Sequence, residues 1–229
     1  MRTVADVLAL LERDPGRPRL TWYGPDGERV ELSGAVLVNW VSKTTNLLVE
    51  EFDAGPGSRV RVDLPGHWRS VVWQLAAWRV GACLVDDEEE VLVTDAPPAD
   101  APGAEVVAVA LPALARRFDG ALPPGAIDAA AAVMTYGDRI GWAPVPDPAS
   151  PAVDRAGTRV AHADLVETTG SGERVLLAAP RDARGLLGRL AADASLVLTD
   201  GSTARALLAD GARRERLVAT ERVTLDLLG

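Results

Sequence analysis

Two hydrophobic periods alternate along the start of the chain. Apolar residues at positions 4, 7, 8 and 11 share one helical face, and the stretch Leu37–Phe52 keeps the same 3.6-residue spacing. Between them, Leu20–Tyr23 and Arg29–Leu32 alternate as strands do and flank Pro25-Asp26-Gly27, a strong turn signal. The pattern therefore predicts a helix, a β-hairpin and a second helix.

Strand and helix patterns then alternate to the end of the chain. The predicted strands are 60–64, 90–94, 105–110, 174–179, 195–200 and 216–220, and the predicted helices are 67–80, one from Pro112, 127–136, 162–169, 183–193 and 202–210. This order predicts an α/β protein with three α/β/α layers, a mostly parallel sheet and an N-terminal β-hairpin. We expect a single domain over residues 1–229, with an internal linker at 142–151, which holds four prolines.

A short acidic run conflicts with a regular parallel sheet. Only Asp86–Glu89 joins the apolar run 82–85 to the predicted strand 90–94. Because a crossover between parallel strands normally takes a dozen or more residues, we expect one of the two runs not to be a normal parallel strand. Consecutive carboxylates rarely converge on one ion, so Asp86–Glu90 is predicted to be a solvated turn.

Charge and cysteine content exclude several function classes. The formal net charge of −9 repels phosphate backbones, so we expect no nucleic-acid partner. No apolar run reaches the ~18 residues of a membrane span, and the N-terminus has no signal-peptide cleavage site, so a cytoplasmic protein without a membrane partner is expected. A single cysteine, Cys83, and two isolated histidines predict neither a disulfide nor a metal site.

Candidate catalytic residues are few. His67 and His162 could act as general bases, although both stand at predicted helix starts, where capping is the more common role. The single lysine is Lys43, and no Walker lysine motif, no GxGxxG after a strand and no GxSxG motif occurs. For an enzyme whose site lies at the carboxyl ends of parallel strands, the candidates are Asp63, His67, Asp95, His162 and Asp182.

Several segments, taken in order, resemble one enzyme family. These are LTWYGPDGERVELSGAVLVNWVSKTTNLL, GPGSRVRVDLPGHWRSVVWQLAAWRVGACLV, VLVTD, GTRVAHADLVE, RVLLAAPRDARGLLGRLAADASLVL and RRERLVATERVT. They resemble adenylate-forming enzymes, which include acyl-CoA synthetases, nonribosomal-peptide adenylation domains and luciferases. More narrowly, the chain resembles short adenylation-like proteins of GC-rich bacteria. The resemblance covers nearly the whole chain and roughly the first half of the family's large N-terminal portion, and it implies that part of the family's fold.

The resemblance fails at the loop that holds the ATP phosphates in the family. Aligning on Gly157 and His162 places PASPAVDRAG where the family has a Ser/Thr/Gly-rich loop ending in Pro-Lys-Gly, and Ala156 then takes the place of the loop lysine. An anion cradle needs exposed amides and glycine-permitted dihedral angles, whereas prolines remove donors. The residues in the degenerate phosphate-loop region are Asp154, Arg155, Gly157 and Thr158.

Other family features lack a counterpart as well. The charged stretch 180–185 replaces the family's aromatic-His segment, which lines the acyl site. The family's adenine-binding and ribose-binding motifs and its lysine-bearing C-terminal domain have no match before residue 229, and Lys43 lies too early to be that lysine.

We therefore expect the fold of adenylate-forming enzymes without their reaction. The first hypothesis is a catalytically degenerate binding or interaction module that needs no cofactor, with residual nucleotide or CoA binding left open and a protein partner or self-association as its mode of action. A second hypothesis is an enzyme or small-molecule-binding protein that uses the same scaffold with a different site. A third is a half-enzyme completed by a partner chain, with Trp22, Trp40 and Trp142 as interface candidates if they are exposed.

Overall fold

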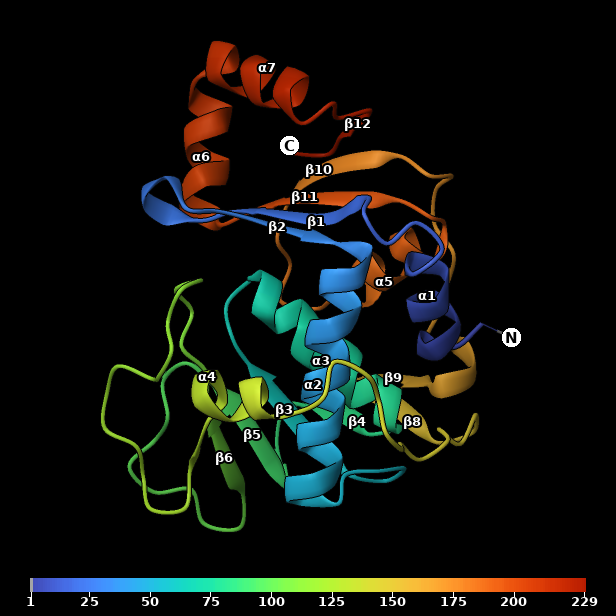
Figure 1. Ribbon diagram of the computed structural model, residues 1–229, viewed down its shortest axis with the longest axis vertical. Coiled ribbons are helices and arrows are strands. Elements are labelled where there is room, and N and C mark those ends of the chain that lie inside the picture. The colour runs from blue at the N-terminus through green and yellow to red at the C-terminus, as the bar shows by residue number, and fades with distance from the viewer. Residues whose placement is uncertain (1) are drawn as a thin grey trace. The chain divides into compact units, whose positions relative to one another are not determined.

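The computed structural model describes residues 2–229, which form two compact units. The first unit comprises residues 2–4, 39–64 and 72–165, and the second comprises residues 5–38, 65–71 and 166–229. The chain thus passes several times from one unit to the other, and each unit has its own sheet (Figure 1).

The second unit is built on a five-stranded sheet with the strand order β12-β10-β11-β1-β2. The N-terminal hairpin β1–β2 is its only antiparallel pair among the described residues, because β1–β11, β10–β11 and β10–β12 are parallel. All five residues of β11 are buried, as is typical of a central parallel strand. The elements of this unit are α1 (Val4–Leu11, from Ala5 onward), β1 (Pro18–Tyr23), β2 (Arg29–Ser33), β10 (Arg174–Ala178), α5 (Arg184–Ala191), β11 (Ser195–Thr199), α6 (Gly201–Ala209), α7 (Gly211–Thr220) and β12 (Leu225–Asp226).

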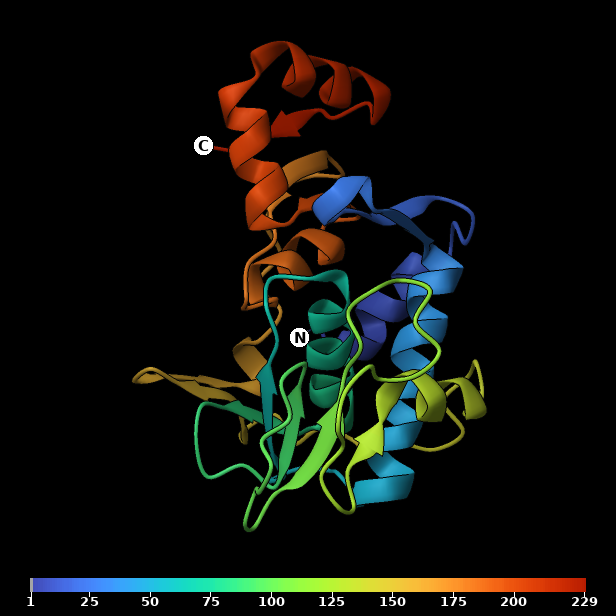
Figure 2. The ribbon, with the colours of Figure 1, turned by 90° about the vertical axis from the view of Figure 1, so that its left-hand side faces the viewer.

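The first unit has a seven-stranded sheet with the order β7-β6-β5-β3-β4-β8-β9, parallel except for the hairpin β8–β9. Helices α2 and α3, which contribute residues to both units, lie against one face of this sheet (Figures 1 and 2). The elements are α2 (Gly34–Phe52), β3 (Arg59–Asp63), α3 (Trp68–Val80), β4 (Cys83–Val85), β5 (Val91–Thr94), β6 (Glu105–Ala108), β7 (Ile127–Asp128), α4 (Ala129–Ala132), β8 (Pro151–Arg155) and β9 (Thr158–Ala161).

The connection between β4 and β5 corrects one prediction. Both strands are parallel to β3 and lie on either side of it, so neither is irregular. Leu84 near the end of β4 and Val91 at the start of β5 both pair with Val60 of β3. The end of β4 and the start of β5 therefore lie at nearly the same height along β3, and the chain does not have to run back along the length of a strand. Residues 86–90 have only to cross one strand, a span of about 10 Å, which five residues reach easily. The dozen-residue rule fails here because β4 has only three residues.

Arg59 holds this short crossover in place. Its side chain donates to the carbonyl oxygens of Glu88 at 2.8 Å and Asp87 at 2.9 Å, and its amide donates to Glu90 Oε2 at 3.2 Å. The Asp87 and Glu88 side chains are more than four-fifths exposed, so the predicted solvated turn is confirmed.

Three predicted elements were wrong. No helix forms at Pro112, where Leu114 is 94% exposed and finds no surface to pack on. The predicted helix 162–169 is a single 3₁₀ turn, His162–Asp164, followed by a Thr-Thr-Gly sequence that disfavours helix. The predicted strand 216–220 belongs to α7, which Asp210 caps by accepting from the Arg213 amide, and which packs Leu217 and Val218 against the core.

The α/β class, the mostly parallel sheets and the N-terminal hairpin are confirmed, with the strands divided between two sheets. Residues 142–150 form an irregular segment that lies inside the first unit, and Pro151 already belongs to β8. The single-domain description of the chain stays a prediction.

Candidate functional site

The degenerate phosphate-loop region is a tight β-hairpin. Asp154 and Arg155 end β8, Thr158 begins β9, and Arg155 pairs with Thr158 across the two strands. Only Ala156 and Gly157 remain for the turn, and both have positive φ, +46° and +75°. These angles are those of the two-residue type I′ turn that suits the twist of a hairpin. The connection between β8 and β9 is therefore the shortest one common between antiparallel strands.

The tip of this hairpin is bound to the crossover of the same unit. The Ala156 amide donates to Asp86 Oδ2 at 2.9 Å, and the Arg155 guanidinium donates to the Val85 carbonyl at 3.2 Å. Arg155 also forms an ion pair with Asp86 at 3.5 Å. A carboxylate of the protein thus occupies two groups that could otherwise meet an anion, the Ala156 amide and the Arg155 guanidinium.

His162 lies just after the hairpin and is buried. Burial lowers the pKa of His162, although contacts with the Gly81 and Ala82 backbone and the charge of Asp147 favour its protonated form. Its Nε2 atom is buried and has no hydrogen-bond partner among the described residues. A neutral imidazole shielded from solvent packs as a core side chain.

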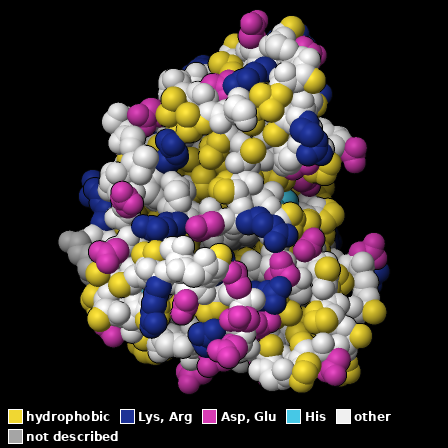
Figure 3. Space-filling model, turned by 180° about the vertical axis from the view of Figure 1, so that it is seen from behind, with side chains coloured by type: hydrophobic (Ala, Val, Ile, Leu, Met, Phe, Trp, Pro, Cys, Tyr) yellow, Lys and Arg dark blue, Asp and Glu magenta, His cyan; other side chains and the backbone are white. Residues whose placement is uncertain are grey.

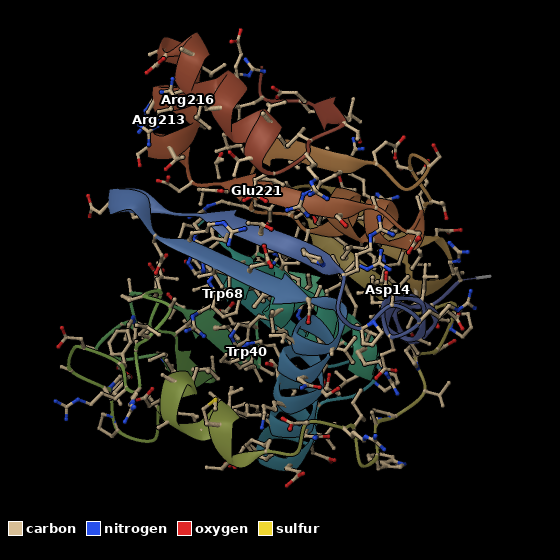
Figure 4. All side chains as sticks on the ribbon, turned by 45° about the horizontal axis from the view of Figure 1, so that its top comes forward. Asp14, Trp40, Trp68, Arg213, Arg216 and Glu221 are labelled. Carbon is tan, nitrogen blue, oxygen red and sulfur yellow. The ribbon has the colours of Figure 1, made fainter. Side chains whose placement is uncertain are left out.

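His67 is a second buried imidazole, in the second unit. Its Nδ1 accepts from the Arg69 amide at 3.1 Å, which caps the start of α3, and its ring meets the Trp22 ring edge-on at 4.7 Å. Burial lowers the pKa of His67 to about 3, helped by the Arg69 charge. Arg69 is itself buried, and its guanidinium lies 4.3 Å from the centre of the Trp68 ring (Trp68 in Figure 4). These contacts give His67 a capping role, and its burial excludes the surface role that the sequence left open.

The three aspartate candidates lie at element ends. Asp182 is exposed and accepts from the Arg184 amide at 2.9 Å, so it caps the start of α5. Asp63 and Asp95 lie at the ends of the adjacent strands β3 and β5, but Thr94, not Asp95, pairs with Asp63. Asp182 and His67 belong to the second unit, whereas Asp63, Asp95 and His162 belong to the first.

The remaining singled-out residues divide by burial. Trp22 is 1% exposed, Trp40 is half-buried and Trp142 is 67% exposed, so Trp142 alone of these three meets the exposure criterion for an interface. Lys43 forms an ion pair with Asp138 at 2.9 Å and donates a hydrogen bond to the Tyr136 carbonyl at 2.5 Å. Cys83 is buried, and burial raises the pKa of its thiol.

The sequence reasoning missed an open groove in the first unit. It has a volume of about 460 Å³ and lies on one face of β3 and β5, between the crossover and the loop 96–104. Arg61 lies within it, paired with Asp63 at 3.1 Å and with Glu89 at 3.7 Å. The remaining wall is made of apolar and acidic residues: Glu88, Leu92, Thr94, Ala96, Pro98, Asp100, Ala101, Pro102 and Ala104.

The alternation in β3 is the signal that could have revealed this groove. Parallel sheets are normally covered on both faces, so their strands are apolar throughout. Arg59, Arg61 and Asp63 instead place charges on every second position of a parallel strand, which indicates a face without a helix above it. Figure 3, which views the chain from behind, shows carboxylates and guanidinium groups interleaved on the lower part of the surface.

A buried carboxylate organises the second unit. Glu221 is 4% exposed and accepts from the Tyr23 hydroxyl at 2.5 Å, from Arg29 at 2.9 and 3.0 Å, and from Arg174. Burial alone would raise the pKa of Glu221, but these hydrogen bonds outweigh it and hold the pKa below its usual range. Figure 4 shows Glu221 close to the strands of the sheet, where it joins the segment after α7 to β1, β2 and β10.

No three His, Cys, Asp or Glu side chains within residues 2–229 gather where they could hold a metal ion. Over the same residues, every helix is too short or too polar to span a lipid bilayer.

Three solved structures that share this fold are CoA ligases or acyl-CoA synthetases. A Brucella canis acyl-CoA synthetase matches over 91% of this chain, with a TM-score of 0.70 and 19% sequence identity. The anthranilate CoA ligase AuaEII, solved in complex with anthranoyl-AMP, matches over 87% of this chain, with a TM-score of 0.66 and 16% sequence identity. A Mycobacterium tuberculosis fatty acyl CoA synthetase matches over 98% of this chain, with a TM-score of 0.63 and 15% sequence identity. The chain spans only 46%, 45% and 48% of these three proteins. At such identities the matches show a shared fold, and the resemblance to adenylate-forming enzymes is confirmed at that level.

Comparison with models of known protein families gives no match. A full-length relative does exist in Mycobacterium tuberculosis H37Rv, a TIGR03089 family protein that is 35% identical over 238 residues. The alignment covers 94% of this chain and 93% of the relative, so the two proteins have similar lengths. The chain belongs to the TIGR03089 family.

Proposed function

We propose that this protein is a catalytically silent form of the adenylate-forming fold that acts as a binding or interaction module. The observation that supports this proposal is the two-residue turn Ala156–Gly157 at the place of the phosphate loop.

A bound triphosphate requires several hydrogen-bond donors and positive charge. Phosphate oxygens are held by several converging backbone amides, usually with a cationic side chain. The turn has only two amides, those of Ala156 and Gly157, and Asp86 already accepts from the Ala156 amide. Asp86 and Asp154 would face the phosphates with like charge. The guanidinium of Arg155 is paired with Asp86, and Arg159 lies opposite Asp154 in the hairpin, so the turn has no excess of positive charge. Neither the number of donors nor the charge suits the ligand.

A thermal-shift titration with magnesium-ATP, AMP and CoA tests the proposal, with an acyl-CoA synthetase of the same fold as the positive control. A ligand at about a hundred times its Kd stabilises by roughly 2.7 kcal/mol. For a chain of this length that is a rise in Tm of very roughly 5 °C. We expect no shift with ATP. A saturable rise would contradict the proposal and return adenylate chemistry to consideration.

The Asp86→Ala variant separates the two parts of the argument. It frees the Ala156 amide and removes a negative charge but leaves the turn at two residues. We expect this variant to stay unresponsive to ATP, because the amides of a two-residue turn are too few to hold a triphosphate. ATP binding by the variant alone would mean that the carboxylate, rather than the loss of the loop, silences the site.

A further inference from the structure

Helix α7 presents a pair of arginines to solvent. Arg213 and Arg216 are three residues apart, so they share one face of the helix, and both are exposed (Figure 4). Within residues 2–229 their guanidinium groups have no ion pair, whereas Arg214 of the same helix is bound to Asp226 at 2.8 Å. The pair is therefore free to meet carboxylates outside the chain.

The groove on β3 and β5 has the complementary charge. Four carboxylates line it against one guanidinium, and that guanidinium, Arg61, is already paired with Asp63 and Glu89. Glu88 and Asp100 remain exposed at its wall, Glu88 at 85% despite Arg59 at 3.6 Å. The groove thus keeps an excess of negative charge toward solvent.

The rest of the wall suits an arginine stem. Its apolar lining residues are Leu92, Ala96, Pro98, Ala101, Pro102 and Ala104. Arginine buries its methylene stem along apolar surface and keeps its charged end at carboxylates, where it forms two parallel hydrogen bonds. Each part of an arginine side chain therefore has a counterpart in the groove.

We infer that the groove receives helix α7 of a second copy of this protein, with Arg213 and Arg216 at Glu88 and Asp100. A second copy is the occupant because the same chain carries both halves of the contact. This inference gives the proposed interaction module a partner and rests on that proposal. The contact joins two different surfaces, so it either closes into a ring or continues as a chain of copies.

Ionic strength should shape this association. The net charge of −9 makes whole molecules repel one another at very low salt. At about 0.1 M salt the Debye length is about 10 Å, so the long-range repulsion is screened while charges in contact still attract. Exposed pairs are individually weak, so the complex should be weak, strongest at moderate salt and lost near 1 M.

Sedimentation velocity across a range of protein concentrations at moderate salt tests the inference. The wild type should show a sedimentation coefficient that rises with concentration. The double variant Arg213→Glu/Arg216→Glu and the double variant Glu88→Lys/Asp100→Lys should each stay monomeric, because each places like charges at the contact. An equimolar mixture of the two should associate again, since each then meets a complementary partner.

The control is Arg13→Glu/Arg116→Glu, which alters the net charge by the same amount at two other exposed arginines. It should associate like the wild type. A wild type that stays monomeric, association that survives both reversals, or variants that fail to associate on mixing would overturn the inference. If a basic peptide rather than a second copy binds the groove, the assignment of the occupant is likewise wrong. Nucleotide binding, in contrast, would contradict the proposed function and leave these results unchanged, so the two failures are distinguishable.

Discussion

Glycine 188 shows how a single residue can fix the packing of a helix. A Cβ atom added at Gly188 would lie 2.2 Å from the Glu167 carbonyl oxygen, whereas one at Gly185, in the same helix α5, would meet nothing within 4 Å. We predict that Gly188→Ala lowers the free energy of unfolding by about 2 kcal/mol or more, because backbone must move. Gly185→Ala should raise it by about 0.5–1 kcal/mol, since alanine favours helix. Urea unfolding of both variants checks the pair; equal effects would contradict the close approach.

Glu221 makes a pH-dependent contribution at the same scale. We predict that Glu221→Gln lowers the free energy of unfolding at pH 7 by about 2–3 kcal/mol, because Arg29 and Arg174 lose a charged acceptor. The pKa of Glu221 lies below its usual value in the folded state, so its contribution is complete above the unfolded value of about 4.5 and is lost as the pH falls through the folded value.

Unfolding curves of wild type and variant between pH 7 and pH 3 measure this dependence. The difference between them should stay constant down to about pH 4.5 and then shrink. A difference that shrinks already between pH 7 and pH 5 would mean that the folded pKa is raised instead.

At the scale of elements, the hairpin β8–β9 is held in a turn that suits only one of its two residues. Ala156 has a left-handed φ of +46°, which is unfavourable by about 1 kcal/mol for a residue with a Cβ atom. Gly157, at +75°, has no such penalty. Ala156→Asn produces the Asn-Gly pair that type I′ turns prefer and should stabilise the protein by up to about 1 kcal/mol. Gly157→Ala should destabilise it by a similar amount although no atom lies within 4 Å of the new Cβ. Thermal unfolding of the two variants should therefore shift in opposite directions, and a shared direction would exclude this turn type.

Arg59 holds the middle of the crossover 86–90. Arg59→Met removes both hydrogen bonds to the Asp87 and Glu88 carbonyls. We predict a loss of about 1–2 kcal/mol and faster amide hydrogen exchange confined to the crossover and its neighbours. Arg159→Met, at an exposed position of β9, is the matched control and should leave exchange in residues 86–90 unchanged.

At the scale of the whole molecule, local pattern predicted most elements and failed where tertiary contacts decide. The 3.6-residue period of α2 and the buried run of β11 are local properties, so both were predicted correctly. Helix α7 was missed because its apolar residues Leu217 and Val218 resemble a strand until the Asp210 cap and the core behind them are known. The division of the strands into two sheets depends on long-range pairing that no sequence window contains.

The candidate site divides in the same way. The departure from the family's phosphate loop can be read in the sequence, since PASPAVDRAG lacks that loop's lysine and the glycines before it. The tie between Ala156 and Asp86 was not, because it joins residues 70 positions apart. The groove exists because the crossover is too short to carry a helix over this face of the sheet. The short connection predicts an irregular strand, and it does not by itself reveal that one face of the sheet is uncovered.

The most direct measurement is an amide NMR titration of the isotopically labelled protein with magnesium-ATP, read at Ala156, Gly157 and Thr158. The structure places these amides in a closed hairpin whose turn donor is bound to Asp86. We predict that their signals do not move at ATP concentrations that saturate acyl-CoA synthetases of this fold. Saturable shifts centred on these three amides would show that the hairpin holds phosphates, and would contradict the proposal of a catalytically silent binding module.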